Sequence, residues 1–77
     1  MLLLFHKESC PYCAKVRDFM ESNEIDYVSI DSEANSPSRD ILAKLGGKSQ
    51  VPFLVDTEHG EMMYESDEII SYLNETC

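Results

Sequence analysis

Residues 2–20 read LLLFHKESCPYCAKVRDFM, and their order sets the start of the fold. The apolar run at residues 2–5 is typical of a strand that is buried on both faces. After Pro11, apolar side chains return at helical spacing, at Tyr12, Val16, Phe19 and Met20. This spacing predicts a helix from Pro11 to about Asn23, with Lys15, Arg17, Asp18 and Glu21 outside its apolar face.

The next segment predicts a second strand and a second helix. Tyr27, Val28 and Ile30 indicate the strand, and Ser36-Pro37 has the form of an N-cap followed by proline at the first helical position. The helix is expected to run to about Leu45, where Gly46-Gly47 ends it. Its predicted buried stripe consists of Ile41, Leu42 and Leu45.

The last third predicts a hairpin and a final helix. Residues 53–55 and 62–64 indicate two short strands, and the polar connection at residues 56–60 has hairpin length. Ser66 is expected to cap a helix whose apolar positions are Ile69, Ile70 and Leu73. The order β-α-β-α-β-β-α predicts an α/β fold with one mixed four-stranded sheet and three helices on its faces. We expect the strands separated by helices to run parallel and the hairpin to be antiparallel.

The sequence has 77 residues, with 15 acidic and six basic side chains and a net charge of −9. This length fits one domain, residues 1–77. So negative a chain is not expected to bind nucleic acid or an anionic membrane. No apolar run approaches the roughly 18 residues that span a bilayer, and residues 1–5 are too short for a secretory signal, so we expect a cytoplasmic protein.

Cys10 and Cys13 form a Cys-x-x-Cys pair between the first strand and the first helix. A sulfur at this position meets free backbone N–H groups and the positive end of the helix dipole, which favour the thiolate. Pro11 suits the first helical position, and Lys7 adds a nearby positive charge. Such surroundings lower a cysteine pKa from roughly 8.5 to about 3.5–7.5, so we expect Cys10 to be a nucleophile and Cys13 its more buried partner.

Two structural uses of the cysteine pair compete with redox exchange. A zinc site needs four ligands, and the other candidates are His6, His59 and Cys77 rather than a second Cys-x-x-Cys pair. A static disulfide across two residues would add little stability and is disfavoured in the cytosol. We therefore expect redox chemistry, no bound metal, and no acid–base role for the histidines.

Three paired motifs resemble those of a glutaredoxin over nearly the whole chain: Cys10-Pro11-Tyr12-Cys13 with Lys7 upstream, Val51-Pro52, and Glu65-Ser66. Residues 50–73 are also similar to the N-terminal domain of glutathione transferases, especially of glutaredoxins that carry a transferase-like helical domain. That helical domain has no counterpart in these 77 residues. Short glutaredoxins usually have Gly-Gly before an aspartate at the start of the last helix, whereas this chain has the transferase-like residues 63–67, so the role of Asp67 is left unassigned.

The resemblance implies a thioredoxin fold and a set of site residues. Cys10 and Cys13 are the implied catalytic pair. The implied glutathione-binding residues are Lys7, Tyr12, Gln50, Val51, Pro52, Glu65 and Ser66. In this interpretation a cis Val51-Pro52 bond exposes the Val51 backbone to the cysteinyl unit of glutathione, and Glu65 and Ser66 receive its γ-glutamyl end.

The resemblance also implies an activity, a glutathione-dependent thiol-disulfide oxidoreductase. Its substrates are glutathionylated or disulfide-bonded proteins, glutathione is the co-substrate, no cofactor is tightly bound, and we expect a monomer. One alternative is a thioredoxin-like protein reduced by a flavoprotein reductase. Another is a carrier of a [2Fe-2S] cluster held between two chains by Cys10 and glutathione, which Pro11 disfavours.

Overall fold

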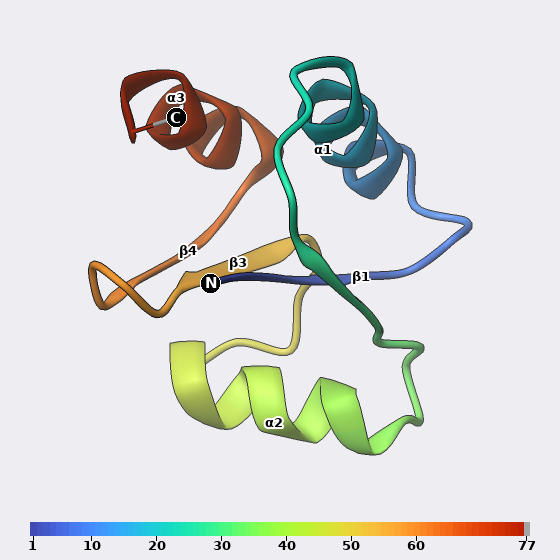
Figure 1. Cartoon of the computed structure of the whole chain (residues 1–77). Coiled ribbons are helices and arrows are strands. Elements are labelled where there is room, and N and C mark those ends of the chain that lie inside the picture. Colours follow the sequence, from blue (N-terminus) through green and yellow to red (C-terminus); the bar gives the residue numbers. More distant parts are fainter. Residues whose placement is uncertain (77) are drawn as a thin grey trace.

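The computed structural model describes residues 1–76 and shows a twisted sheet between two helical layers (Figure 1). The elements in chain order are β1 (Leu2–His6), α1 (Pro11–Ser22), β2 (Val28–Asp31), α2 (Pro37–Gly46), β3 (Phe53–Asp56), β4 (Glu61–Tyr64) and α3 (Ser66–Thr76). The predicted order and the mixed four-stranded sheet are confirmed, and the fold is thioredoxin-like. Within residues 1–76, no helix combines the length and apolar character needed to cross a membrane.

The strands lie in the order β2-β1-β3-β4. β1 and β2 are parallel, whereas β3 is antiparallel to both β1 and β4. The expectation of parallel strands around each helix holds for β1 and β2 and is wrong for β3. Asp31 ends β2 opposite His6, and Phe53 begins β3 opposite Phe5, so the connection through α2 leaves and re-enters the sheet at the same end. The chain therefore returns through β3 in the opposite direction.

β1 separates two cores, because alternate side chains of a strand point to opposite faces. Leu4 packs beneath α1 and α3, which lie together on one face of the sheet, and Phe5 packs beneath α2 on the other face (Figure 1). The first core contains Leu4, Val16, Met20, Leu54, Ile69 and Leu73. The second contains Phe5, Leu42 and Phe53. The strand thus leads from the interior to the loop that precedes Cys10.

The predicted buried stripe of α2 is wrong for two of its three residues. Leu42 is fully buried, but Ile41 and Leu45 are 53% and 47% exposed. Gly46, one turn after Leu42, lies so close to Tyr64 that an added Cβ would fall 2.6 Å from Cε2 of its ring. The helix therefore contacts the sheet through Leu42 and Gly46. Because α2 is the single helix on this face, only a narrow strip of its surface is buried.

The start of α3 lies one residue earlier than predicted. Ser66 is the first helical residue and is buried, while the carbonyl oxygen of Glu65 accepts the first helical hydrogen bond, from the N–H of Ile69, at 3.0 Å. Glu65 is thus the capping residue, since a cap accepts that bond while its own backbone is not helical. Its φ of 68° is left-handed, which turns the chain sharply from β4 into α3.

Candidate active site at the start of α1

Cys10 immediately precedes α1 and has an extended backbone, with φ −87° and ψ 116°. Its carbonyl oxygen accepts a hydrogen bond from the N–H of Ala14 at 3.1 Å, and its own N–H donates to the carbonyl of Lys7 at 3.2 Å. Cys10 and Cys13 are both free thiols, and the side chain of Cys10 is partly exposed whereas that of Cys13 is fully buried. One sulfur is thus presented to solvent, and the other lies behind it.

The surroundings of Cys10 favour its thiolate. Partial burial opposes ionisation, but hydrogen bonds from the backbone and thiol of Cys13 and from the backbone of Tyr12, together with the charge of Lys7, outweigh it. The pKa of Cys10 therefore lies below its ordinary value. These are the donors expected at a helix N-terminus, where the first N–H groups have no partner within the helix.

The surroundings of Cys13 disfavour its thiolate while Cys10 is reduced. Burial raises the pKa of the Cys13 thiol to about 11, although a hydrogen bond from the Lys7 backbone acts in the other direction. The hydrogen bond to Cys10 and the charge of Cys10 raise this pKa as well, whereas Arg17 lowers it. In the reduced pair, Cys13 thus keeps its proton and donates a hydrogen bond to the sulfur of Cys10, which is the first of the two to ionise.

A pocket of about 420 Å³ opens beside the cysteine turn. It is lined by Tyr12, Gln50, Val51, Pro52, Glu65, Ser66 and Asp67. Three segments that are distant in sequence meet here: the first turn of α1, the loop before β3, and the start of α3. Tyr12 is 64% exposed, so it is not part of the buried face of α1 that its spacing with Val16 and Met20 indicated. The Val51-Pro52 peptide bond is cis, as the resemblance also implied.

Lys7 is the one predicted glutathione-binding residue that does not line this pocket. It lies in the loop between β1 and Cys10, and its positive charge lowers the pKa of Cys10. The structure therefore places Lys7 beside the sulfur and the remaining six residues around the pocket.

Two features of the pocket had no signal in the sequence. The side-chain amide of Gln50 donates a hydrogen bond of 3.0 Å to the carboxylate of Glu65. Asp67 lines the pocket and pairs with Lys15 of α1, whose Nζ lies 2.6 Å from Oδ1. Lys15 had been placed on the polar face of the helix without a role, because no local spacing relates residues 52 positions apart.

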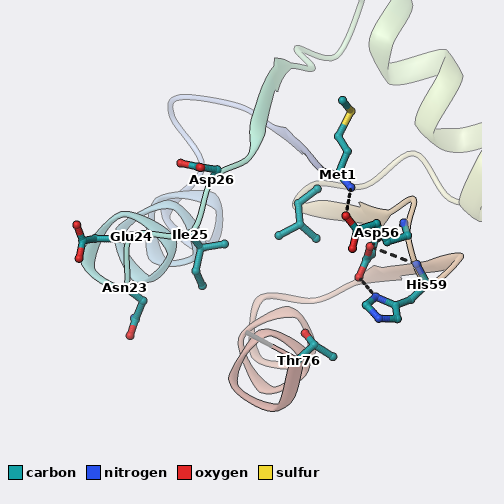
Figure 2. Close-up of a pocket in the computed structure, with 10 residues that line it drawn as sticks. Met1, Asn23, Glu24, Ile25, Asp26, Asp56, His59 and Thr76 are labelled. Atoms are coloured by element: carbon teal, nitrogen blue, oxygen red, sulfur yellow. Dashed lines mark hydrogen bonds and ion pairs between the residues drawn. The ribbon is translucent and has the colours of Figure 1, made fainter.

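A second pocket, of about 430 Å³, lies at the end of the molecule near Met1 and contains none of the predicted site residues (Figure 2). There the carboxylate of Asp56 accepts hydrogen bonds from Tyr72 at 2.5 Å and from Nδ1 of His59 at 2.7 Å. The Tyr72 bond chiefly lowers the pKa of Asp56 to about 2, and the His59 bond contributes. Asp56 also accepts from the backbone N–H of Glu58, so this cluster holds the β3–β4 turn.

No metal-binding cluster is found in the part of the chain that the structure describes. Within residues 1–76, no three His, Cys, Asp or Glu side chains are grouped so that they could hold a metal ion. Cys77, one of the other candidate zinc ligands, lies outside the described residues.

The fold, the Cys-x-x-Cys pair at the start of its first helix and the similarity to glutaredoxins make this chain a glutaredoxin-like protein of the thioredoxin fold. Within that class, the chain belongs to the family described as "Glutathione S-transferase, N-terminal domain", whose sequence model matches residues 4–76.

Individual relatives agree with this assignment. Glutaredoxin 3 of Escherichia coli K12 is 26% identical over 57 residues, which are 73% of this chain and 69% of the relative. A glutathione S-transferase from Methylobacillus flagellatus, solved with glutathione bound, has a TM-score of 0.82 at 26% identity over 95% of this chain. The match covers only 35% of that transferase, so the chain spans about a third of its length. A buckwheat glutaredoxin–glutathione complex shares the fold, with a TM-score of 0.76 at 20% identity.

Proposed function

We propose that the protein is a glutathione-dependent thiol-disulfide oxidoreductase acting in a reducing, cytoplasmic compartment. The observation that carries this proposal is the partly exposed Cys10, whose pKa is lowered, in front of the buried Cys13 and beside a pocket of about 420 Å³. The solved transferase and glutaredoxin with bound glutathione support glutathione as the ligand of that pocket.

The first proposed reaction uses Cys10 alone. Its thiolate attacks the glutathione sulfur of a protein–glutathione disulfide, a bond forms between Cys10 and glutathione, and the protein leaves as a thiolate that takes up a proton. A second glutathione, as its thiolate, attacks the adduct and leaves as oxidised glutathione, and Cys10 is restored. The low pKa of Cys10 assists both steps, because it supplies a nucleophile first and a good leaving group second.

The second proposed reaction uses both cysteines. Cys10 attacks a protein disulfide and becomes part of a mixed disulfide, and Cys13 then attacks Cys10 and releases the substrate as a dithiol. The hydrogen bond between the two side chains in the reduced protein shows that their sulfurs lie within reach of each other. The resulting Cys10–Cys13 disulfide is reduced by two glutathione molecules.

The pocket offers complementary groups for each end of the tripeptide. Glu65 and Ser66 line the pocket, and Ser66 begins α3. In this proposal the Glu65 carboxylate receives the γ-glutamyl ammonium group, and Ser66 with the first N–H groups of α3 receives the γ-glutamyl carboxylate. The Val51 backbone offers a donor and an acceptor in the manner of an added strand. Tyr12 and Gln50 line the pocket. Lys7 does not line it, and in this proposal its positive charge, which also acts on Cys10, pairs with the glycyl carboxylate.

A coupled assay tests the proposal. Reduction of hydroxyethyl disulfide by glutathione is followed with glutathione reductase for the wild type and for Cys10→Ser and Cys13→Ser. We expect Cys10→Ser to abolish turnover and Cys13→Ser to retain it, while reduction of the disulfides of insulin is lost in both. Turnover by thioredoxin reductase in place of glutathione, or full activity of Cys10→Ser, would overturn the assignment.

A further inference from the structure

Two buried nitrogen atoms have no hydrogen-bond partner among the described residues. They are Nδ1 of His6 and Nε of Arg17. His6 is only 4% exposed, and its other ring nitrogen is hydrogen-bonded to the hydroxyl of Ser29 on β2. Arg17 is half-buried, so its expected position outside the apolar face of α1 is only partly correct. A buried N–H donor without a hydrogen-bond partner costs free energy, and such donors are rare in folded proteins.

Arg17 lies next to Cys13 because of the helical repeat. Residues four apart on a helix are neighbours, with about 5–6 Å between their Cβ atoms. Both residues belong to α1, and Cys13 points into the interior beneath it. The charge of Arg17 lowers the pKa of the Cys13 thiol, and it also lowers the pKa values of the His6 imidazole and the Tyr27 phenol. The guanidinium therefore lies within electrostatic reach of the buried sulfur.

The charged groups around this site come from α1, β1, β2 and the loop before Cys10. Burial lowers the pKa of His6, the charge of Arg17 lowers it further, and Asp31 and Glu8 act in the opposite direction. The pKa of His6 is therefore below its ordinary value, and Arg17 is the charged side chain whose effect favours the Cys13 thiolate.

The environment of Cys13 changes when Cys10 enters a mixed disulfide. In the reduced protein, burial, the hydrogen bond to Cys10 and the charge of Cys10 all raise the pKa of Cys13. Both contributions of Cys10 disappear once its sulfur is covalently bound and uncharged. Burial then remains opposed by the Lys7 backbone N–H and by Arg17. The pKa of Cys13 is thus lower in the mixed disulfide than in the reduced protein, at the stage when its thiolate attacks Cys10.

We propose that Arg17 is a positioning residue for the dithiol reaction, and that its guanidinium stabilises the Cys13 thiolate that resolves mixed disulfides on Cys10. In this step the sulfur of Cys13 forms a bond with Cys10, and the bond between Cys10 and the substrate sulfur breaks. The substrate leaves with the electron pair and takes up the proton that Cys13 has lost. The two cysteines are oxidised and the substrate is reduced, so no further oxidant or reductant is required.

The expected size of the effect follows from two opposing trends. Loss of a neighbouring charge raises a thiol pKa by about one unit, which lowers the thiolate fraction about tenfold below that pKa. A more basic thiolate is also a better nucleophile, with a Brønsted slope of about 0.5, which recovers about threefold. Arg17→Gln should therefore slow the resolving step about threefold at pH 7 and move its pH midpoint upward by about one unit.

The inference rests on the proposed dithiol function, and a single-turnover experiment separates the two. The Cys77→Ser protein is mixed with the aromatic disulfide dithiobis(nitrobenzoate). One coloured thiolate is released when Cys10 attacks the reagent, and a second is released when Cys13 resolves the adduct. The second release is independent of reagent concentration, because it is intramolecular. Its rate is measured from about pH 5 to 10, a range that brackets the pKa of roughly 8.5 of a free thiol. Absence of a second release, or its persistence in Cys13→Ser, would contradict the dithiol function itself.

Three variants test Arg17 specifically. Arg17→Gln should show the slower second release and the higher midpoint, and Arg17→Lys, which keeps the charge, should restore both. Lys44→Gln removes the same charge from α2, on the other face of the sheet, and should leave the second release unchanged. The inference is overturned if Arg17→Gln matches the wild type, if Arg17→Lys is as slow as Arg17→Gln, or if Lys44→Gln causes the same shift.

Discussion

The side-chain amide of Gln50 donates a hydrogen bond of 3.0 Å to the carboxylate of Glu65, and both side chains line the pocket beside Tyr12. Gln50 belongs to the loop before β3, whereas Glu65 is the left-handed residue that caps α3. The bond therefore fixes the direction of a carboxylate that would otherwise rotate freely. A carboxylate held in this way is ready to accept an ammonium group without losing further side-chain entropy.

Glu65→Gln tests whether this carboxylate receives the γ-glutamyl ammonium. The substitution keeps the shape and removes the charge, so we expect KM for glutathione to rise about tenfold, which corresponds to loss of about 1.4 kcal/mol. kcat at saturating glutathione should change little, because Glu65 does not act on the sulfur.

Glu68→Gln is the matched control for Glu65. Glu68 is exposed in the first turn of the same helix and does not line the pocket, so it alters the helix charge equally. Steady-state kinetics with varied glutathione measure both variants. Equal KM values for Glu65→Gln and wild type would remove Glu65 from the binding site.

Lys7→Glu should raise the pKa of Cys10. The Lys7 charge favours the thiolate, and a carboxylate at this position would disfavour it, so the midpoint should move upward by about one unit. The rate of Cys10 alkylation by iodoacetamide, measured against pH in a Cys77→Ser background, reports this midpoint. Lys44→Glu provides the same change in net charge at α2 and should leave the profile in place. An unaltered pH profile of alkylation in Lys7→Glu would show that the Lys7 charge does not influence the pKa of Cys10.

Tyr72→Phe should destabilise the fold in a pH-dependent way. The Tyr72 hydroxyl is the main cause of the low Asp56 pKa of about 2, against an ordinary value of 3.8. Because the folded-state pKa is depressed, its contribution to stability is present above about pH 4 and is lost as the pH falls through about 2. Removing a hydrogen bond to a buried carboxylate costs about 2 kcal/mol at neutral pH, and the cost should shrink towards pH 2.

Urea unfolding at neutral pH and at low pH measures the effect of Tyr72→Phe. Tyr27→Phe is the control, because its hydroxyl donates to Glu21 at 3.0 Å on the surface, where such a bond contributes little. A loss for Tyr72→Phe that is the same at every pH would show that the hydroxyl does not act through the charge of Asp56.

Gly46→Ala should destabilise the protein although alanine is the better helix former. The new Cβ would lie 2.6 Å from Cε2 and 2.7 Å from Cζ of Tyr64, and this ring is held by a hydrogen bond of 2.6 Å from its hydroxyl to the Lys48 carbonyl. Overpacking of this kind costs about 1–3 kcal/mol, more than the roughly 1 kcal/mol gained from helix propensity. Thermal unfolding measures the balance, and a raised melting temperature would show that Tyr64 moves aside freely.

Much of the architecture could be predicted because strands and helices produce apolar patterns that repeat over a few residues. The apolar run before Cys10 and the helical spacing after it identified β1 and α1, and the turn before residue 61 identified the hairpin. The stripe assigned to α2 failed at Ile41 and Leu45, since a periodic apolar pattern does not reveal how wide a surface the sheet offers. The direction of β3 failed for a related reason, because it depends on where the connection through α2 re-enters the sheet.

By itself, the sequence determined the position of the cysteine pair at a helix start, where local backbone geometry directs free N–H groups at the first sulfur. A helix start is a local feature, because it depends on the backbone dihedral angles of a few consecutive residues. Only the tertiary structure decided that Gln50 meets Glu65, that Lys15 meets Asp67, and that Nε of Arg17 is buried without a hydrogen-bond partner. The two side-chain pairs join distant segments, and the burial of the Arg17 Nε depends on how α1 packs against the sheet. Such contacts leave no local pattern in the sequence.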